Sequence, residues 1–114
     1  MKKLVEKFKA LSDSNRVRIL KMLEVRPLCV CEITEILKLA TSTVSKHLSI
    51  LRDAEYITDK KEGKWVSYHL NRENNNEYVR HLLPLMHTWL PADVTILSDQ
   101  KKVETVDRNN LCGV

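Results

Sequence analysis

Two helix-forming segments joined by a very short connection place the strongest constraint on the fold. The first runs from Glu32 to Leu39, and the second runs from Thr41 to Leu51. Two helices in such close succession have the spacing of a helix-turn-helix, in which the second helix can enter the major groove of DNA. The spacing therefore predicts a helix-turn-helix over about residues 32–53.

Two β-rich runs follow this helix pair. They cover residues 56–61 and 64–70, and Glu62-Gly63 between them has the composition of a two-residue hairpin turn. A basic hairpin directly after a helix-turn-helix is typical of a wing, which we predict over about residues 56–70. The fold class is therefore mainly α with a small β-hairpin, a winged helix-turn-helix within one domain of residues 1–91.

Apolar residues surround much of a helix predicted over about residues 77–90. Because such a helix needs partners on more than one side, we expect a homodimer that forms through the terminal helices. Pro84 lies inside this helix and should either bend it or divide it into two. Beyond Pro91 the apolar pattern weakens, and residues 92–114 are assigned to a C-terminal tail with some helix.

Composition limits the remaining possibilities. The chain has 114 residues, and Lys plus Arg outnumber Asp plus Glu by 19 to 15, a balance that is compatible with nucleic acid. Charged residues interrupt the N-terminal segment, and no stretch approaches the roughly 20 apolar residues of a membrane span. We therefore expect a cytoplasmic protein with no membrane partner. In that reducing compartment Cys29, Cys31 and Cys112 are core residues, metal ligands or reactive thiols.

Cys29 and Cys31 stand two residues apart at the start of the first helix of the pair. Two thiolates at this spacing can chelate one soft ion, and a helix N-terminus favours the thiolate form. The alternative is that both are small apolar residues that fill the core, since cysteine is among the most buried residue types. Spacing alone does not decide between these two interpretations.

Residues 10–51, with the box Leu28–Glu32 and the run Thr43–Leu48, resemble the arsenic-repressor (ArsR/SmtB) family of metal-sensing transcriptional repressors. The resemblance covers about residues 4–90. It implies a homodimer that requires no cofactor and binds double-stranded operator DNA at an inverted repeat. It also implies release of that DNA when As(III), Sb(III) or an organic arsenical binds cysteine thiolates.

One departure from the family concerns the third sulfur ligand. The arsenic-sensing box of the family has another cysteine three residues after the second, where this chain has Thr34. Either Cys29 and Cys31 form a two-thiolate site suited to singly organic arsenicals, or Cys112 supplies the third thiolate from the tail. A cysteine near a C-terminus is also commonly an incidental surface thiol. The last helix lacks the paired ligands of the zinc-sensing relatives, so no zinc site is expected there.

The predicted DNA-contacting residues lie on the second helix and on the wing. Setting Val44, Leu48 and Leu51 toward the core exposes a small polar and basic face. That face is placed to meet base edges or phosphates. The family resemblance implies that His47, the next residue after Lys46, also contacts DNA. Basic residues at the wing should anchor phosphates. These candidates are Ser42, Thr43, Ser45, Lys46, His47, Arg52, Lys60, Lys61 and Lys64. A charged hairpin tip is, by itself, usually only a solvated edge.

Glu55 stands where the family usually has glycine, directly after the second helix. If this position requires a left-handed backbone, glutamate there costs on the order of 1 kcal/mol. We expect the fold to tolerate that strain.

An enzyme, a protein-interaction module and a repressor with another signal are the alternatives to a metalloid-responsive repressor. The chain has two glycines and lacks both a glycine-rich phosphate loop and a paired-carboxylate site, so we do not expect an enzyme. A winged helix can instead serve as a protein-interaction module. A repressor of the same fold that senses oxidants through its thiols, or another soft metal such as cadmium or lead, is the closest alternative.

Overall fold

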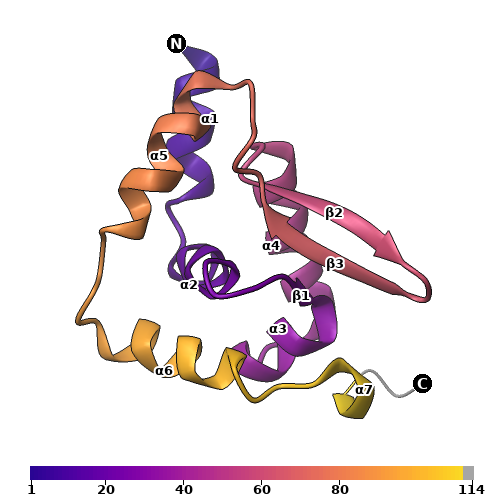
Figure 1. The fold of residues 1–114 in the computed structure, drawn as a ribbon. Coiled ribbons are helices and arrows are strands. Elements are labelled where there is room, and N and C mark those ends of the chain that lie inside the picture. The colour runs from indigo at the N-terminus through magenta and orange to yellow at the C-terminus, as the bar shows by residue number, and fades with distance from the viewer. Residues whose placement is uncertain (112–114) are drawn as a thin grey trace.

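The computed structural model describes residues 1–111 of the chain. Three helices precede α4 (Thr41–Asp53), the helix predicted to contact DNA, two wing strands follow it, and the remaining helices come last (Figure 1). In chain order, the elements of these residues are α1 (Lys2–Ala10), α2 (Ser14–Leu23), β1 (Leu28–Cys29), α3 (Val30–Leu37), α4 (Thr41–Asp53), β2 (Ile57–Glu62), β3 (Trp65–Leu70), α5 (Glu77–His87), α6 (Val94–Val103) and α7 (Arg108–Leu111).

The arrangement is a winged helix-turn-helix, as the sequence predicts. In Figure 1, α1 and α5 lie side by side on one flank, α2 occupies the centre, and the β2–β3 hairpin projects away on the opposite side. α3 and α4 lie between the centre and the hairpin, while α6 packs against α2 below. No helix within residues 1–111 is both long and apolar enough to cross a membrane.

The core forms around α2, because this helix is enclosed by the others. Ile19, Leu20 and Met22 are fully buried, and α4 adds Val44, Leu48 and Leu51 at helical spacing. Burying a side chain of this size contributes roughly 1.5–3 kcal/mol. The burial of these three α4 residues fixes which face of α4 is left exposed.

A third strand, β1, is absent from the sequence prediction. It pairs antiparallel with β3, with Leu28 opposite Tyr68 and Cys29 opposite Ser67, and the sheet order is β1-β3-β2. A two-residue strand has no periodicity of its own, so only its partner defines it. The pairing connects the segment that precedes α3 directly to the wing.

The hairpin turn lies one residue later than predicted. Glu62 still pairs with Trp65, so Gly63 and Lys64 form the turn, and the expectation of Glu62-Gly63 is wrong by one position. Gly63 has φ +62°, the left-handed conformation that two-residue hairpin turns require and that glycine adopts without strain.

Pro84 lies inside one continuous helix, α5, so the alternative of two shorter helices is excluded. The side chain of Asn76 accepts hydrogen bonds from the N–H groups of Tyr78 and Val79 and so caps the helix at its start. α5 ends at His87, and Leu90 has a positive φ, so the helix does not continue to residue 90.

The segment after residue 91 contains a packed helix, α6. Ile96 and Val103 are buried, and the carboxylate of Asp99 accepts two hydrogen bonds from Arg18 at 2.7 and 3.0 Å. Asp99 is only 2% exposed, and the Asp99 carboxylate raises the pKa of Arg18 through this hydrogen bond. The partners lie 81 residues apart, which explains why α6 shows only a weak local pattern.

Glu55 does adopt the left-handed backbone, with φ +72°. Its carboxylate lies 3.3 Å from the ammonium of Lys7, which is buried on α1, and accepts a hydrogen bond from the side chain of Asn76. The side chain of Asn74 donates to the Glu55 carbonyl at 2.8 Å. These contacts join α1, the end of α4 and the start of α5, and they offset part of the backbone strain.

The backbone of Glu55 provides a first prediction. Glu55→Ala and Glu55→Gly both remove the carboxylate, but only glycine relieves the left-handed strain, so Glu55→Gly should be the more stable by about 1 kcal/mol. At Ser98, an exposed site inside α6, glycine should instead be less stable than alanine by about 1 kcal/mol. Urea unfolding at one protein concentration measures both pairs. The same sign at the two sites would contradict a strained Glu55.

Candidate DNA-binding face and thiol site

The outer face of α4 carries the residues predicted to read DNA. Burial of Val44, Leu48 and Leu51 turns the other side of the helix outward. The structure leaves Ser42, Thr43, Ser45 and Lys46 exposed on that side. The first turns of α4 therefore present short hydrogen-bonding side chains and one flexible cation, which is the chemistry of a base and phosphate contact.

His47 is half-buried and lies beside a residue that sequence reasoning missed, Arg16 on α2. The guanidinium Nη1 of Arg16 lies 3.2 Å from Nδ1 of His47, and its Nε donates to the carbonyl of Ala10 at 2.7 Å. Arg16 lines a shallow hollow with Ser42, Thr43 and Lys46. This second cation therefore borders the exposed face of α4, and only the packing of α2 against α4 brings it there.

The wing is basic but its cations are not equivalent. Lys60 and Lys61 are successive residues of β2, so their side chains point to opposite faces of the hairpin. Arg52 forms an exposed ion pair with Asp59 at 3.1 Å, and Lys64 lies 5.2 Å from the ring centroid of Trp65.

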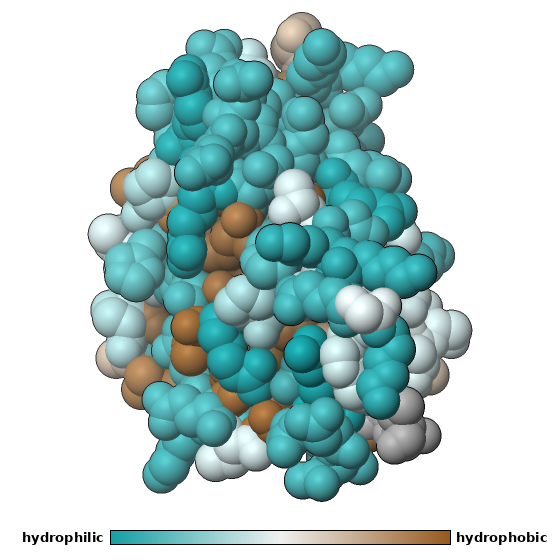
Figure 2. Space-filling view, turned by 45° about the vertical axis from the view of Figure 1, so that its right-hand side comes forward, coloured by the Kyte–Doolittle hydropathy of each residue, from teal (hydrophilic) through white to brown (hydrophobic). Residues whose placement is uncertain are grey.

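Hydrophilic residues cover most of the view in Figure 2, and apolar residues show mainly in hollows between them.

Cys29 ends β1 and caps the start of α3, and it is a free thiol that is 4% exposed. The carboxylate of Glu32, one turn into the helix, accepts the Cys29 N–H at 2.9 Å. Arg26 donates to the other oxygen of Glu32 at 3.1 Å. This pair holds the Cys29 backbone in place, and the Cys29 sulfur accepts a hydrogen bond from Arg108 at 3.7 Å.

The two other cysteines differ from Cys29. Cys31, half-buried on the first turn of α3, is disulfide-bonded in this structure, so a ligand role requires its reduced form. Cys112 lies outside the described residues. Among residues 1–111, no three His, Cys, Asp or Glu side chains are grouped so that they could hold a metal ion.

Thr34 follows Cys31 by one helical turn, and residues at this spacing share a helix face. Its hydroxyl oxygen is buried and has no hydrogen-bond partner within the described residues. An unsatisfied hydroxyl costs roughly 1–3 kcal/mol. Among the described residues, the structure therefore has a polar atom without a partner at the position where the resemblance expects a third sulfur.

A cleft of about 530 Å³ opens beside Cys29, between β3 and the segment that precedes α7. Ser67 and Glu62 form part of its wall, and the Ser67 hydroxyl donates to the Glu62 carboxylate. That hydrogen bond, together with the positive charge of Arg108, holds the pKa of Glu62 below its ordinary value. The cleft wall next to the thiol is therefore polar and charged.

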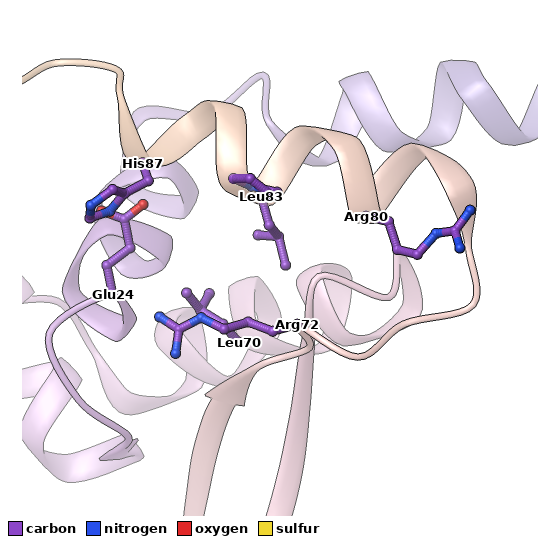
Figure 3. Close-up of a pocket in the computed structure, with 7 residues that line it drawn as sticks. Glu24, Leu70, Arg72, Arg80, Leu83 and His87 are labelled. Atoms are coloured by element: carbon purple, nitrogen blue, oxygen red, sulfur yellow. The ribbon is translucent and has the colours of Figure 1, made fainter.

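A smaller hollow of about 180 Å³ lies where α5 meets the end of β3. In Figure 3, Leu83 points from α5 toward Leu70, and the His87 imidazole lies next to Glu24. Nδ1 of His87 is 3.5 Å from the Glu24 carboxylate, which the buried ammonium of Lys21 also contacts at 2.9 Å. These charges connect α5 to the end of α2, away from the thiol site.

α3, α4 and the wing beside them make this chain a winged helix-turn-helix protein, a class that includes many DNA-binding regulators, and its similarity to known proteins identifies the family. Residues 13–59 match the profile described as "Bacterial regulatory protein, arsR family". The arsenical resistance operon repressor of Bacillus subtilis is 44% identical over 77 residues, which cover 67% of this chain and 73% of that protein. The chain belongs to the arsR family and is a transcriptional regulator.

Solved structures agree with this fold. Reduced HlyU from Vibrio cholerae is 33% identical with a TM-score of 0.62, and the match covers 75% of this chain and 85% of that one. A winged helix-turn-helix DNA-binding domain from Mycobacterium bovis, described as homodimeric, has a TM-score of 0.63 at 24% identity over 74% of each chain. At that identity the second likeness supports the fold alone.

Arg26 provides a test of the thiol site's support. Its guanidinium donates to the carbonyls of Val103 and Val106, both at 2.9 Å, as well as to Glu32. Arg26→Met should cost about 2 kcal/mol, because it leaves the buried Glu32 carboxylate without its charged partner. Hydrogen exchange should rise at the Cys29 amide and across residues 104–111. Arg72→Met, at an exposed arginine, is the control, and equal protection in both variants would contradict this role.

Proposed function

We propose that the protein is a homodimeric repressor that binds operator DNA and releases it when As(III), Sb(III) or an organic arsenical binds Cys29 and Cys31. One observation carries the proposal: Cys29 is at once the N-cap residue of α3, the first helix of the helix-turn-helix, and a paired residue of the wing sheet. A ligand at this thiol acts directly on both parts of the DNA-binding unit. The similarity to the arsenical resistance repressor supports the class of inducer.

The exposed face of α4 supports the DNA contact. Ser42, Thr43, Ser45 and Lys46 would meet base edges and phosphates at the groove, and Arg16 and His47 would border them. Lys64 and one of Lys60 and Lys61 would contact phosphates from the wing, because only one face of the hairpin can turn toward the duplex. Arg52 would contribute a positive charge near the DNA, and its ion pair with Asp59 would also hold the wing strand β2 against the end of α4.

The terminal helices support a homodimer. Val5 and Phe8 on α1 are 43% and 52% exposed, and Leu85 on α5 is 51% exposed, although all three are apolar. α1 and α5 lie side by side, so these residues belong to the same flank of the molecule (Figure 1). A second copy that covers this flank would bury these residues and place two recognition helices on one inverted repeat.

The inducer site follows from thiol chemistry. Each bond between arsenic and sulfur replaces a hydroxide on the metalloid, and the hydroxide leaves as water with the thiol proton. Two cysteines at this spacing can each form one such bond, and Cys29 and Cys31 are positioned on either side of the start of α3. An organic arsenical, whose carbon already occupies one position, needs only these two sulfurs.

A second candidate function is redox sensing by the same repressor, and the disulfide bond of Cys31 favours it. In that case an oxidant, rather than a metalloid, would change the affinity for DNA. The HlyU structure that resembles this chain is described as the reduced form, which shows that a redox state was distinguished in that relative.

One titration tests the proposal and separates these candidates. Protein bound to fluorescent operator DNA, kept reduced, is titrated with arsenite, phenylarsenite, cadmium or zinc while anisotropy is measured. Release by the arsenicals under reducing conditions supports metalloid sensing. Release by diamide alone would instead assign a redox sensor, and no binding to any inverted repeat would reject both.

Two lysines should affect DNA binding in different ways. Lys46→Ala, on the exposed face of α4, should weaken operator binding more than binding to random DNA. Lys64→Ala, at the wing tip, should weaken both about equally and reduce the dependence of log K on log salt by about one unit. Binding isotherms at several salt concentrations measure these effects. Identical losses on both DNAs for both variants would show that α4 is not the reading helix.

Thr34 should determine the response to inorganic arsenite. Thr34→Cys places a third thiol one turn after Cys31, so the arsenite concentration for half-release should fall by about ten-fold, while phenylarsenite, which needs two sulfurs, should respond as before. Thr34→Val fills the same space without a thiol and is the control. If Thr34→Cys and Thr34→Val respond to arsenite alike, the third sulfur position is not at residue 34.

A further inference from the structure

Arg108, on the short helix α7, contacts two parts of the molecule that are far apart in sequence. Its Nη1 donates to the sulfur of Cys29 at 3.7 Å, and its guanidinium carbon lies 5.1 Å from the ring centroid of Trp65 on the wing. A guanidinium at that distance from an indole face is within the range of a cation–π contact. One side chain therefore touches both the sensor thiol and the first residue of the second wing strand.

The surroundings of Arg108 make this bridge sensitive to the state of the sulfur. The hydrogen bond from Nη1 holds only while the Cys29 sulfur can accept it, and the Glu62 and Glu32 carboxylates line the same cleft. Trp65 has a second cation, Lys64, at 5.2 Å from its ring centroid. The sulfur therefore contributes to holding the guanidinium where it also meets the indole.

The segment that carries Arg108 is fixed at its base. Arg26 binds the carbonyls of Val103 and Val106, so α7 starts from an anchored point close to the cleft beside Cys29. Arg108 and Cys29 both line that cleft. A change at the sulfur can therefore displace the Arg108 side chain without first unfolding the C-terminal segment.

We propose that Arg108 is the positioning residue that transmits the state of the Cys29 sulfur to the wing. This inference rests on the proposed function, since it concerns the same thiol. A sulfur that shares its electron pair with arsenic is a poorer acceptor for the guanidinium than a free thiol or thiolate. Arg108 then leaves Cys29 but keeps its contact with Trp65, so the displaced guanidinium moves the indole and, with it, the β2–β3 hairpin against DNA. Without a guanidinium at residue 108, the strand pairing alone sets the hairpin and the state of the sulfur does not reach it.

The fluorescence of Trp65 provides a readout of the proposed role. If Arg108 only stabilised the fold, its replacement would not change the response of this fluorescence to the inducer. The chain has two tryptophans, so Trp89→Phe leaves Trp65 as the sole indole emitter. In this background three proteins are compared: unmodified Arg108, Arg108→Gln and Arg108→Lys. Lys101→Gln, at an exposed residue of α6, removes one positive charge from the same end of the chain and is the matched control.

Phenylarsenite is added to each reduced protein, and both Trp65 emission and operator anisotropy are followed. In the protein that keeps Arg108, and in the Lys101→Gln control, the Trp65 emission should shift and the operator should be released. Without inducer, Arg108→Gln should bind the operator as tightly as the protein with Arg108. With inducer, it should show no emission shift, and the ratio of its operator dissociation constants with and without phenylarsenite should be smaller by at least about five-fold. Arg108→Lys, which keeps the charge without the planar fork, should fall between them.

An Arg108→Gln protein that retains both the emission shift and full release would overturn the proposal and leave the metalloid sensor intact. The proposal is also overturned if Arg108→Gln loses operator binding without inducer, because Arg108 would then be needed for the DNA-binding structure itself and not for the response to the sulfur. If phenylarsenite fails to release the operator even from the protein with Arg108, the proposed function itself fails, and this inference fails with it.

Discussion

The pairing of β1 with β3 is the contact on which the rest of the functional arrangement depends. Two residues of backbone, Leu28 and Cys29, join the start of α3 to the second strand of the wing. The same two residues are buried, so the strand cannot shift without exposing apolar surface. A thiol on this strand is therefore connected to both elements of the DNA-binding unit at once, without any long pathway between them.

Charged side chains complete this connection where backbone pairing ends. The buried carboxylate of Glu32 holds the Cys29 N–H and is in turn held by Arg26, which also fixes the C-terminal segment. A buried carboxylate left unpaired is costly, so these groups are expected to move together or to stay together. At the other end of the helix pair, after α4, strained Glu55 joins α4 to α1 and α5. Each end of the DNA-reading unit is thus tied to a helix outside it.

Local pattern predicted the helix pair, the wing and the buried face of α4, because each depends on spacing within a few residues. The left-handed backbone at Glu55 was raised only by the glycine that the resembling family usually has there. Local pattern could not predict β1, which exists only through its pairing with β3. It also missed the packing of α6, which is held by Asp99 against Arg18. Arg16 and Arg108 escaped notice for the same reason, since their partners lie 31 and 79 residues away. The candidate thiols were visible in the sequence, but their surroundings were not.

In the proposed mechanism a ligand on the Cys29 sulfur alters DNA binding through β1 and α3. The most direct measurement is the operator dissociation constant of reduced protein with and without phenylarsenite, for the natural chain, Cys29→Ser and Cys31→Ser. Without inducer all three should bind equally, since neither thiol belongs to the exposed face of α4. With inducer, affinity should fall by about a hundred-fold in the natural chain and stay unchanged in both variants. A Cys29→Ser protein that releases the operator as readily as the natural chain would contradict the account.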